Sequence, residues 1–138
     1  MITSGQLLST IILSQMAVVL KSNSIMKKYI ATLREPDGRM SHHSDHEMKR
    51  HQVDWKFWFE NWRNADRLIE GSGLGMIGKI IYSSGSVENR IHQTGTEIIG
   101  GFLLLKAEDL NDATEMVKTC PVYDFGGYAE IRELQNQN

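Results

Sequence analysis

The sequence predicts an α+β fold of the ferredoxin-like kind, in which strands and helices follow the order βαββαβ. The clearest observation is that residues 97–132 have the pattern of a strand, a helix and a second strand in succession. Residues 29–82 repeat this succession less regularly, with a strand, a long helix and a short strand. Two such units side by side give a four-stranded antiparallel sheet with both helices on one face.

The first predicted strand spans residues 29–34, where Tyr, Ala and Leu occupy every second position, the period of a strand. Glu-Pro-Asp-Gly at residues 35–38 supplies the turn chemistry that ends this strand. After a polar, histidine-rich loop at residues 39–45, Ser44 and Glu47 form a capping box. This pair predicts the start of a long helix that ends near residue 65.

The long predicted helix has one broad apolar side. Its members at helical spacing are Met48, His51, Trp55, Trp58, Phe59 and Trp62. Val53 and Phe57 fall on the opposite side, where a solvated helix should be polar. We therefore expect these two side chains either to cover the N-terminal segment or to contact a partner.

A glycine-rich passage at residues 71–78 connects this helix to a predicted strand at residues 79–82. The passage precedes a strand instead of opening a helix, and it lacks the Lys-Ser/Thr pair of a phosphate-binding loop. The sequence therefore gives no support to a phosphate site there. A tight turn at residues 83–86 and a polar stretch at residues 87–95 lead to the next strand.

The second unit has the clearest boundaries. Residues 98–105 are rich in Ile, Leu and Phe and predict a strand. Asp109 is a good N-cap for a helix whose apolar stripe runs to Cys120, and Pro121 then stops the helix. After a glycine pair, a period of two at residues 128–134 predicts the last strand.

The strand at residues 98–105 bears on oligomeric state. Adjacent residues on a strand point to opposite faces of the sheet, so this run places apolar side chains on both faces. The two helices cover only one of them. A two-fold homodimer, sheet face against sheet face along residues 97–105, is the economical cover for the other.

Composition limits the partners and the compartment. The chain has 138 residues, enough for one domain, and a formal net charge of −2 from 15 basic and 17 acidic residues. This charge provides no basic surface for nucleic acid. Cys120 is the only cysteine, so no intramolecular disulfide can form, and we expect a reducing, cytoplasmic compartment.

The first 25 residues contain an apolar run that resembles the core of a signal peptide. No Lys or Arg precedes the run, and Ser, Thr and Gln interrupt it, so we do not expect a cleaved leader or membrane association. We expect residues 1–25 to be an extension that the fold does not need and residues 26–138 to be the domain. The alternative is an amphipathic helix packed on the domain.

Several segments together resemble the YCII-related proteins, in particular the branch named for a DGPF motif. The similar segments are MKKYIATLREPDGR, HQVDWKFWFENW, RLIEGSGL, GGFLLLKAEDLNDATEMVKTCP and GGYAEIREL, which span most of residues 26–134. The resemblance implies a dimeric α/β barrel. Some relatives are cofactor-independent lyases or isomerases that act on small oxidised ring compounds, and others occur beside regulators of transcription.

Two departures from the family pattern matter for function. Where the branch has Asp-Gly-Pro-Phe, residues 89–92 are Asn-Arg-Ile-His, so the motif is absent. A related branch uses a His and Asp pair, and those positions align with Trp55 and Cys120 here. His51 lies one helical turn before Trp55.

His51 is the first candidate catalytic residue, because an imidazole with a pKa near ~6.5 suits acid–base chemistry and its side of the helix is packed. The alternative is a structural histidine bonded to a carbonyl. His92, with Arg90 and Glu97 nearby, is a second candidate at a pocket edge, or an exposed turn. Trp55, Trp58 and Trp62 could bind an aromatic ligand or belong to the core.

The loop histidines and the cysteine are weaker candidates. His42, His43, Asp45 and His46 match no closed ligand set, so we expect no metal and a solvated loop. Cys120 lacks a basic neighbour in sequence and is expected to be a small buried hydrophobe.

Two functions remain open. In the first, the protein is a small homodimer that binds a small molecule in a pocket and acts as a cofactor-independent lyase or isomerase, with Trp55, Trp58 and Arg90 contacting the ligand. In the second, it is a non-catalytic regulatory or interaction module. A ligand-sized pocket that contains His51 would favour the first.

Overall fold

The computed structural model of the protein describes residues 25–40 and 42–138. The strands are β1 (Lys27–Pro36), β2 (Leu68–Gly73), β3 (Ile80–Ile81), β4 (Val87–Glu88), β5 (Glu97–Ala107) and β6 (Tyr128–Glu133). The helices are α2 (Asp45–Asn64) and α3 (Leu110–Val117), with short 3₁₀ helices η1 (Gly38–Met40) and η2 (Pro121–Phe125). The proposed N-terminal extension lies, apart from Ile25, outside the described residues.

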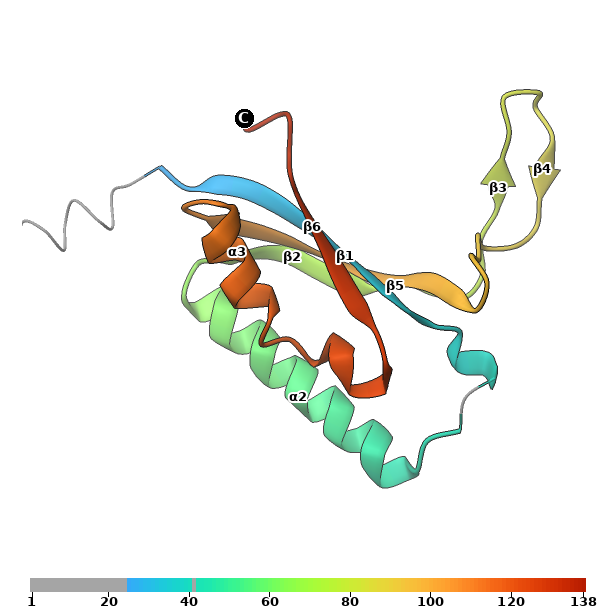
Figure 1. The fold of residues 1–138 in the computed structure, drawn as a ribbon, viewed down its shortest axis with the longest axis horizontal. Helices are drawn as coiled ribbons and strands as arrows, with labels where there is room; N and C mark the ends of the chain where they lie inside the picture. Colours follow the sequence, from blue (N-terminus) through green and yellow to red (C-terminus); the bar gives the residue numbers. More distant parts are fainter. Residues whose placement is uncertain (1–24, 41) are drawn as a thin grey trace, which may run out of the picture.

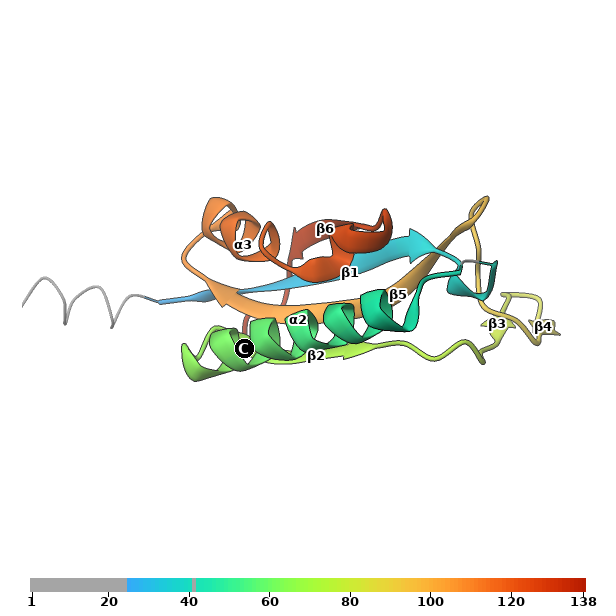
Figure 2. The ribbon, with the colours of Figure 1, turned by 90° about the horizontal axis from the view of Figure 1, so that it is seen from below.

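The predicted α+β class is confirmed. Four strands form one antiparallel sheet in the order β2-β5-β1-β6. Within the described residues α2 and α3 lie on the same side of this sheet (Figures 1 and 2). The sheet is open, with β2 and β6 as its edges.

The core lies between the sheet and the helices. Every second residue is buried in β1 from Tyr29 to Leu33 and in β5 from Gly101 to Ala107, as the period of a strand requires. The largest of the fully buried side chains are Tyr29, Leu103, Leu105, Met116 and Val117. Three of these come from β1 and β5 at the centre of the sheet, and the other two come from α3.

The predicted start of the long helix is confirmed in detail. The Ser44 hydroxyl accepts a hydrogen bond from the Glu47 backbone N–H at 3.1 Å, and Glu47 Oε1 accepts from the Ser44 backbone N–H at 3.3 Å. This reciprocal pair is the capping box. Trp58 is the buried residue of α2, while Trp55, Phe59 and Trp62 pack against the core from a partly buried position.

The position of the second sheet strand was predicted wrongly. The strand that pairs with β5 is Leu68–Gly73, whereas residues 79–82 contribute to a separate two-stranded hairpin. Glycines made this segment look like a loop, but the packing requires one of them. A Cβ at Gly71 would meet the Phe59 ring at 2.6 Å, so α2 can lie over β2 only because this position has no side chain.

The second helix also ends earlier than predicted. It stops at Val117, and Cys120 lies in the turn before Pro121 instead of on the helix. Cys120 is nevertheless buried, as expected. None of the described helices is both long enough and apolar enough to span a membrane.

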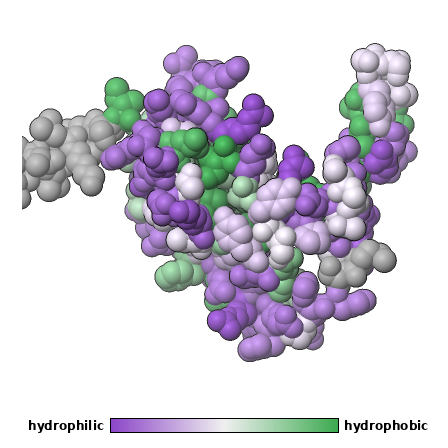
Figure 3. Space-filling view, in the orientation of Figure 1, coloured by the Kyte–Doolittle hydropathy of each residue, from purple (hydrophilic) through white to green (hydrophobic). Residues whose placement is uncertain are grey.

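We call residues 76–92, which include β3 and β4, the arm. The arm extends away from the rest of the domain and carries apolar side chains on its surface (Figures 1 and 3). Ile77 is fully exposed, and Ile81 is 74% exposed. Gly85 makes the turn between the two strands with φ of 87°, a value that favours glycine.

Candidate functional site

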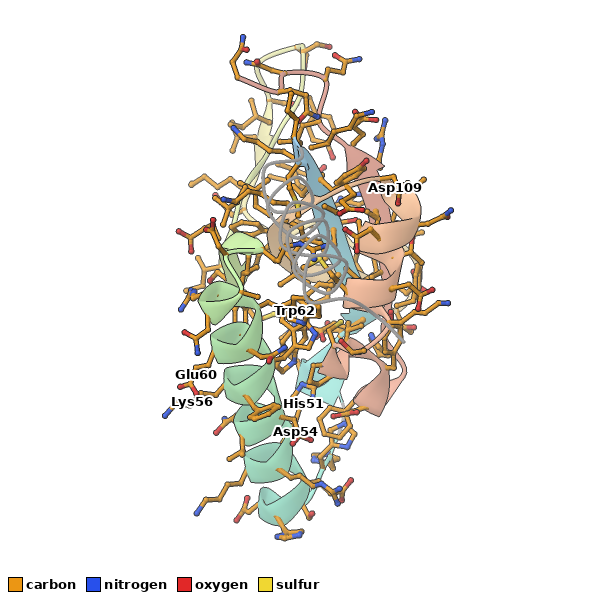
Figure 4. The ribbon with its side chains drawn as sticks, turned by 90° about the vertical axis from the view of Figure 1, so that its left-hand side faces the viewer. His51, Asp54, Lys56, Glu60, Trp62 and Asp109 are labelled. Carbon is orange, nitrogen blue, oxygen red and sulfur yellow. The ribbon has the colours of Figure 1, made fainter. Side chains whose placement is uncertain are left out.

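A cavity of about 310 Å³ lies between α2 and the sheet. Most of its wall is apolar and comes from Leu33, Trp55, Phe59, Phe102, Leu103 and Val122. Two ionisable side chains also line it, Glu35 from β1 and His51 from α2. Figure 4 shows His51 on the inner side of α2, whereas Lys56 and Glu60 project from its outer side.

Glycines keep the cavity open. Gly73 of β2 and the pair Gly100-Gly101 of β5 lie on its wall and contribute no side chains. The pairing of β1 with β5 shifts register here: Leu33 pairs with Gly101, but Arg34 pairs with Ile99. Gly100 is therefore the extra residue of a β-bulge, a feature that bends strands and redirects neighbouring side chains.

The Glu35 carboxyl lies directly over Gly100. A Cβ on Gly100 would overlap Glu35 Oε1, so the carboxyl occupies the space that any other residue at position 100 would fill. Burial raises the pKa of Glu35 above its usual value, and a positive charge on the nearby His51 would act in the opposite direction. Within the described residues, no group is found that donates a hydrogen bond to this carboxyl.

His51 is held on both ring nitrogens. Its Nδ1 lies 3.0 Å from Asp124 Oδ2, and its Nε2 lies 3.1 Å from Trp55 Nε1. An indole N–H can only donate, so Nε2 accepts from Trp55, and Nδ1 carries the proton that is donated to Asp124. The contacts select this one neutral tautomer and join α2 to η2.

A second hollow of about 400 Å³ adjoins the first, because Glu35 and His51 line both. His42 and His43 reach its wall from the loop before α2. The His43 ring stacks on Phe125 with ring centroids 3.8 Å apart. Among the described residues, no group of three or more His, Cys, Asp or Glu side chains is arranged to hold a metal ion.

The structure places the predicted tryptophans differently from one another. Trp55 lines the cavity, but Trp58 is buried beside it and donates its indole N–H to Thr119 Oγ1 at 2.9 Å. The Trp62 ring lies under the Arg67 guanidinium, 5.6 Å from ring centroid to Cζ.

Burial raises the pKa of the Cys120 thiol to about 11, which suits an inert thiol.

Arg90 and His92 do not line the cavity that contains His51. Arg90 pairs with Glu88 on the arm, and both side chains are about half exposed. His92 is exposed, with Nε2 3.3 Å from Thr94 Oγ1. The structure therefore separates the two predicted histidines.

The sequence prediction missed two residues of the site, Glu35 and Asp124. Residues 35–38 were interpreted as a turn, yet the strand period continues into Glu35 and β1 ends at Pro36. The glycine pair in the neighbouring strand was the available signal, because glycine within a strand often marks a bulge or a close approach. Asp124 is 73 positions away from His51 in sequence, so no local pattern joins them.

Comparisons with known proteins do not assign the chain to a group: no protein-family model matches it, and no curated protein shows significant similarity to it.

Proposed function

We propose that the protein binds a small molecule in the cavity between α2 and the sheet and acts on it by proton transfer without a cofactor, as a lyase or an isomerase. The observation that carries this proposal is that Glu35 and His51 line one cavity whose remaining wall is mostly apolar. Its volume of about 310 Å³ is at the lower end of the range for small-molecule sites, ~300–1,000 Å³.

The chemistry divides between the two groups. No described residue donates a hydrogen bond to Glu35. Burial raises its pKa toward neutral pH, and a carboxyl whose pKa lies near the working pH transfers protons efficiently. The Nε2 lone pair of His51 already accepts a hydrogen bond from Trp55. Glu35 is therefore the primary acid or base. His51 holds the Trp55 ring in place at the cavity wall through this bond.

Kinship with the YCII-related proteins belongs to the same proposal. The strand order β2-β5-β1-β6, with both described helices on one side, supports the ferredoxin-like arrangement of that family. The contact between His51 and Asp124 supports it further, because a His and Asp pair reappears near the expected site on different residues. The single cysteine, free and buried, supports a reducing, cytoplasmic compartment.

A homodimer completes the proposal. Ile30 and Leu104 lie on the face of the sheet away from the helices and are only half-buried. The Thr32 hydroxyl on the same face is buried without a hydrogen-bond partner.

We expect light scattering to show a dimer at micromolar concentration and a smaller particle for Leu104→Glu. A monodisperse monomer of the unmodified protein would contradict the dimer and leave the cavity proposal standing.

The cavity proposal is tested by blocking the cavity without disturbing the fold. A Cβ at Gly73 would meet only the Gly100 carbonyl oxygen, at 3.8 Å, so Gly73→Leu can be accommodated and projects toward the cavity. Native mass spectrometry should detect a small molecule on the purified protein and none on Gly73→Leu. Gly75→Leu is the control, because a side chain there meets open space outside the cavity.

An interaction module without catalysis is the second candidate, and exposed apolar side chains favour it. Phe57 is 72% and Val53 57% exposed on the outer side of α2, and the arm exposes Ile77 and Ile81. Such side chains on separate surfaces are suited to protein partners. If Phe57→Ser and Ile81→Ser abolish the biological role while Glu35→Gln and Gly73→Leu leave it intact, the second candidate replaces the first.

A further inference from the structure

The described wall of the cavity contains an acidic side chain but no Lys or Arg. Glu35 and His51 are its ionisable wall residues. Two arginines on neighbouring elements are engaged elsewhere: Arg39 forms an ion pair with Asp37 at 2.7 Å, and the Arg63 guanidinium stacks on Phe59, with Cζ 5.4 Å from the ring centroid. Asp124 adds a carboxylate behind His51, outside the cavity wall. A bound carboxylate or phosphate would meet the Glu35 carboxyl and a single imidazole at the wall.

The Glu35 carboxyl is open to a hydrogen bond from a bound molecule. Its oxygens are not among the buried polar atoms that lack a partner, so they face the cavity, where water or a ligand can donate to them. The described chain supplies no such bond to Glu35, and β5 keeps Gly100 bare so that the carboxyl can lie at the cavity wall. A ligand in the cavity can therefore donate a hydrogen bond to Glu35 in place of water.

The volume and the wall limit the rest of the ligand. A cavity of about 310 Å³ holds one ring with a short substituent, given that a cavity of roughly 150 Å³ accommodates benzene. Trp55 and Phe59 present aromatic faces and edges, which suit an unsaturated or aromatic ring.

From these observations we infer that the ligand is a compact ring compound whose polar end donates a hydrogen bond to Glu35, as an amine or hydroxyl does, and that carries no carboxylate or phosphate. The inference rests on the proposed function, because it concerns the same cavity. It adds the chemical class of the ligand and assigns Glu35 as the residue that recognises it.

Three probes with the same ring test this class: benzylamine, benzyl alcohol and benzoate. Their binding is followed at neutral pH by the amide and indole signals of the ¹⁵N-labelled protein. The Trp55 indole N–H is a direct reporter because it bonds to His51 at the cavity wall, and Trp55→Phe assigns its signal. We expect benzylamine and benzyl alcohol to shift this signal and benzoate at the same concentration to leave it unchanged.

Variants then assign the recognition to Glu35. Glu35→Gln should weaken benzylamine binding about tenfold or more, because the negative charge that faces the ammonium is removed, and should affect benzyl alcohol less, because the amide oxygen still accepts a hydrogen bond from the hydroxyl. Glu60→Gln, an exposed change on the outer side of α2, should alter neither. The amide spectrum of each variant reports whether it remains folded.

The outcomes separate this inference from the proposed function. Benzoate binding as tightly as benzylamine, or benzylamine binding unaffected by Glu35→Gln, would overturn the inference while the cavity remains a binding site. Failure of all three probes, together with no small molecule on the purified protein, would overturn both. Loss of benzylamine binding in Glu35→Gln with retained benzyl alcohol binding is the result that supports it.

Discussion

The two strand–helix–strand units of the sheet use their helices in opposite ways. In the first unit, formed by β1, α2 and β2, a helix of 20 residues has one buried residue, Trp58. In the second unit, formed by β5, α3 and β6, a helix of 8 residues has three buried residues, Ala113, Met116 and Val117. The short helix is thus packed more completely than the long one.

Side-chain shape explains the difference. The rings of α2 contact one another edge to face or tilted, with centroids 5.6–6.3 Å apart for the pairs among Trp55, Trp58, Phe59 and Trp62. Large rigid rings leave space next to glycines, and the cavity occupies that space. In α3 the fully buried Ala113 allows the helix to pack closely on the sheet. The comparison indicates that α3 is the more tightly packed helix and that the cavity lies beside α2.

The largest effect that this comparison predicts is in the second unit. Met116→Ala removes a fully buried side chain from closely packed surroundings and should lower the free energy of unfolding by about 2–5 kcal/mol. Urea denaturation measures the change. Leu110→Ala on the same helix is the control and should change stability by less than about 0.5 kcal/mol, because Leu110 is exposed. Equal effects from the two substitutions would contradict the tight packing of this helix.

A smaller effect is expected where α2 meets η2. Replacing His51 by Gln or Asp124 by Ala breaks the hydrogen bond between them, and each change should cost about 1 kcal/mol. Combining them should show a coupling energy of about 0.5 kcal/mol or more, since the second change has no bond left to break. A double-mutant cycle by thermal and urea unfolding measures it. Additive losses would mean that the pair is not joined in solution.

His43 supplies the matched control for that cycle. It stacks on Phe125, beside Asp124 in sequence, but is exposed and has no hydrogen bond to Asp124. His43→Gln combined with Asp124→Ala should therefore be additive.

The smallest predicted effect concerns pH and Glu35. Its pKa is raised in the folded protein by burial, so the folded state favours the protonated form more than the unfolded state does. The contribution of Glu35 to stability is thus fully present below the ordinary pKa of 4.5 and is lost as pH rises through the folded value. Glu35→Gln has no such titration. Its midpoint of thermal unfolding should therefore rise relative to that of the unmodified protein as pH increases from acid to neutral, and a constant difference across that range would contradict the raised pKa.

Local rules were sufficient to predict much of the fold. The capping box of Ser44 and Glu47, the alternation in β1 and the regular second unit each depend on neighbouring residues, and all appear in the structure. The strand β2 was misplaced because it depends on contacts between residues that are far apart in sequence. Its glycines make Leu68–Gly73 look like a loop, but they are needed for close contact with Phe59 of α2 and with β5, which no local pattern reveals.

The candidate site was predictable to a lesser degree. His51 and Trp55 were found because they lie on the apolar side of a helix, and both line the cavity. Glu35 was missed because residues 35–38 have the composition of a turn although β1 continues to Pro36, and Asp124 because it approaches through η2 from far along the chain. Arg90 and His92 were selected for their family position, and the arm holds them away from the cavity.

The bulge at Gly100 also links two positions that are far apart in the chain. A Cβ at position 100 would overlap the Glu35 carboxyl, so a side chain there would force the carboxyl to move from its place at the cavity wall. A lineage that acquired Ala at position 100 would therefore have to turn the acid at position 35 aside or shorten it. Among descendants of a common ancestor, an acid at position 35 that faces the cavity is expected together with Gly at position 100. Such joint inheritance would distinguish chains that keep an acid at the cavity wall from those that have moved it.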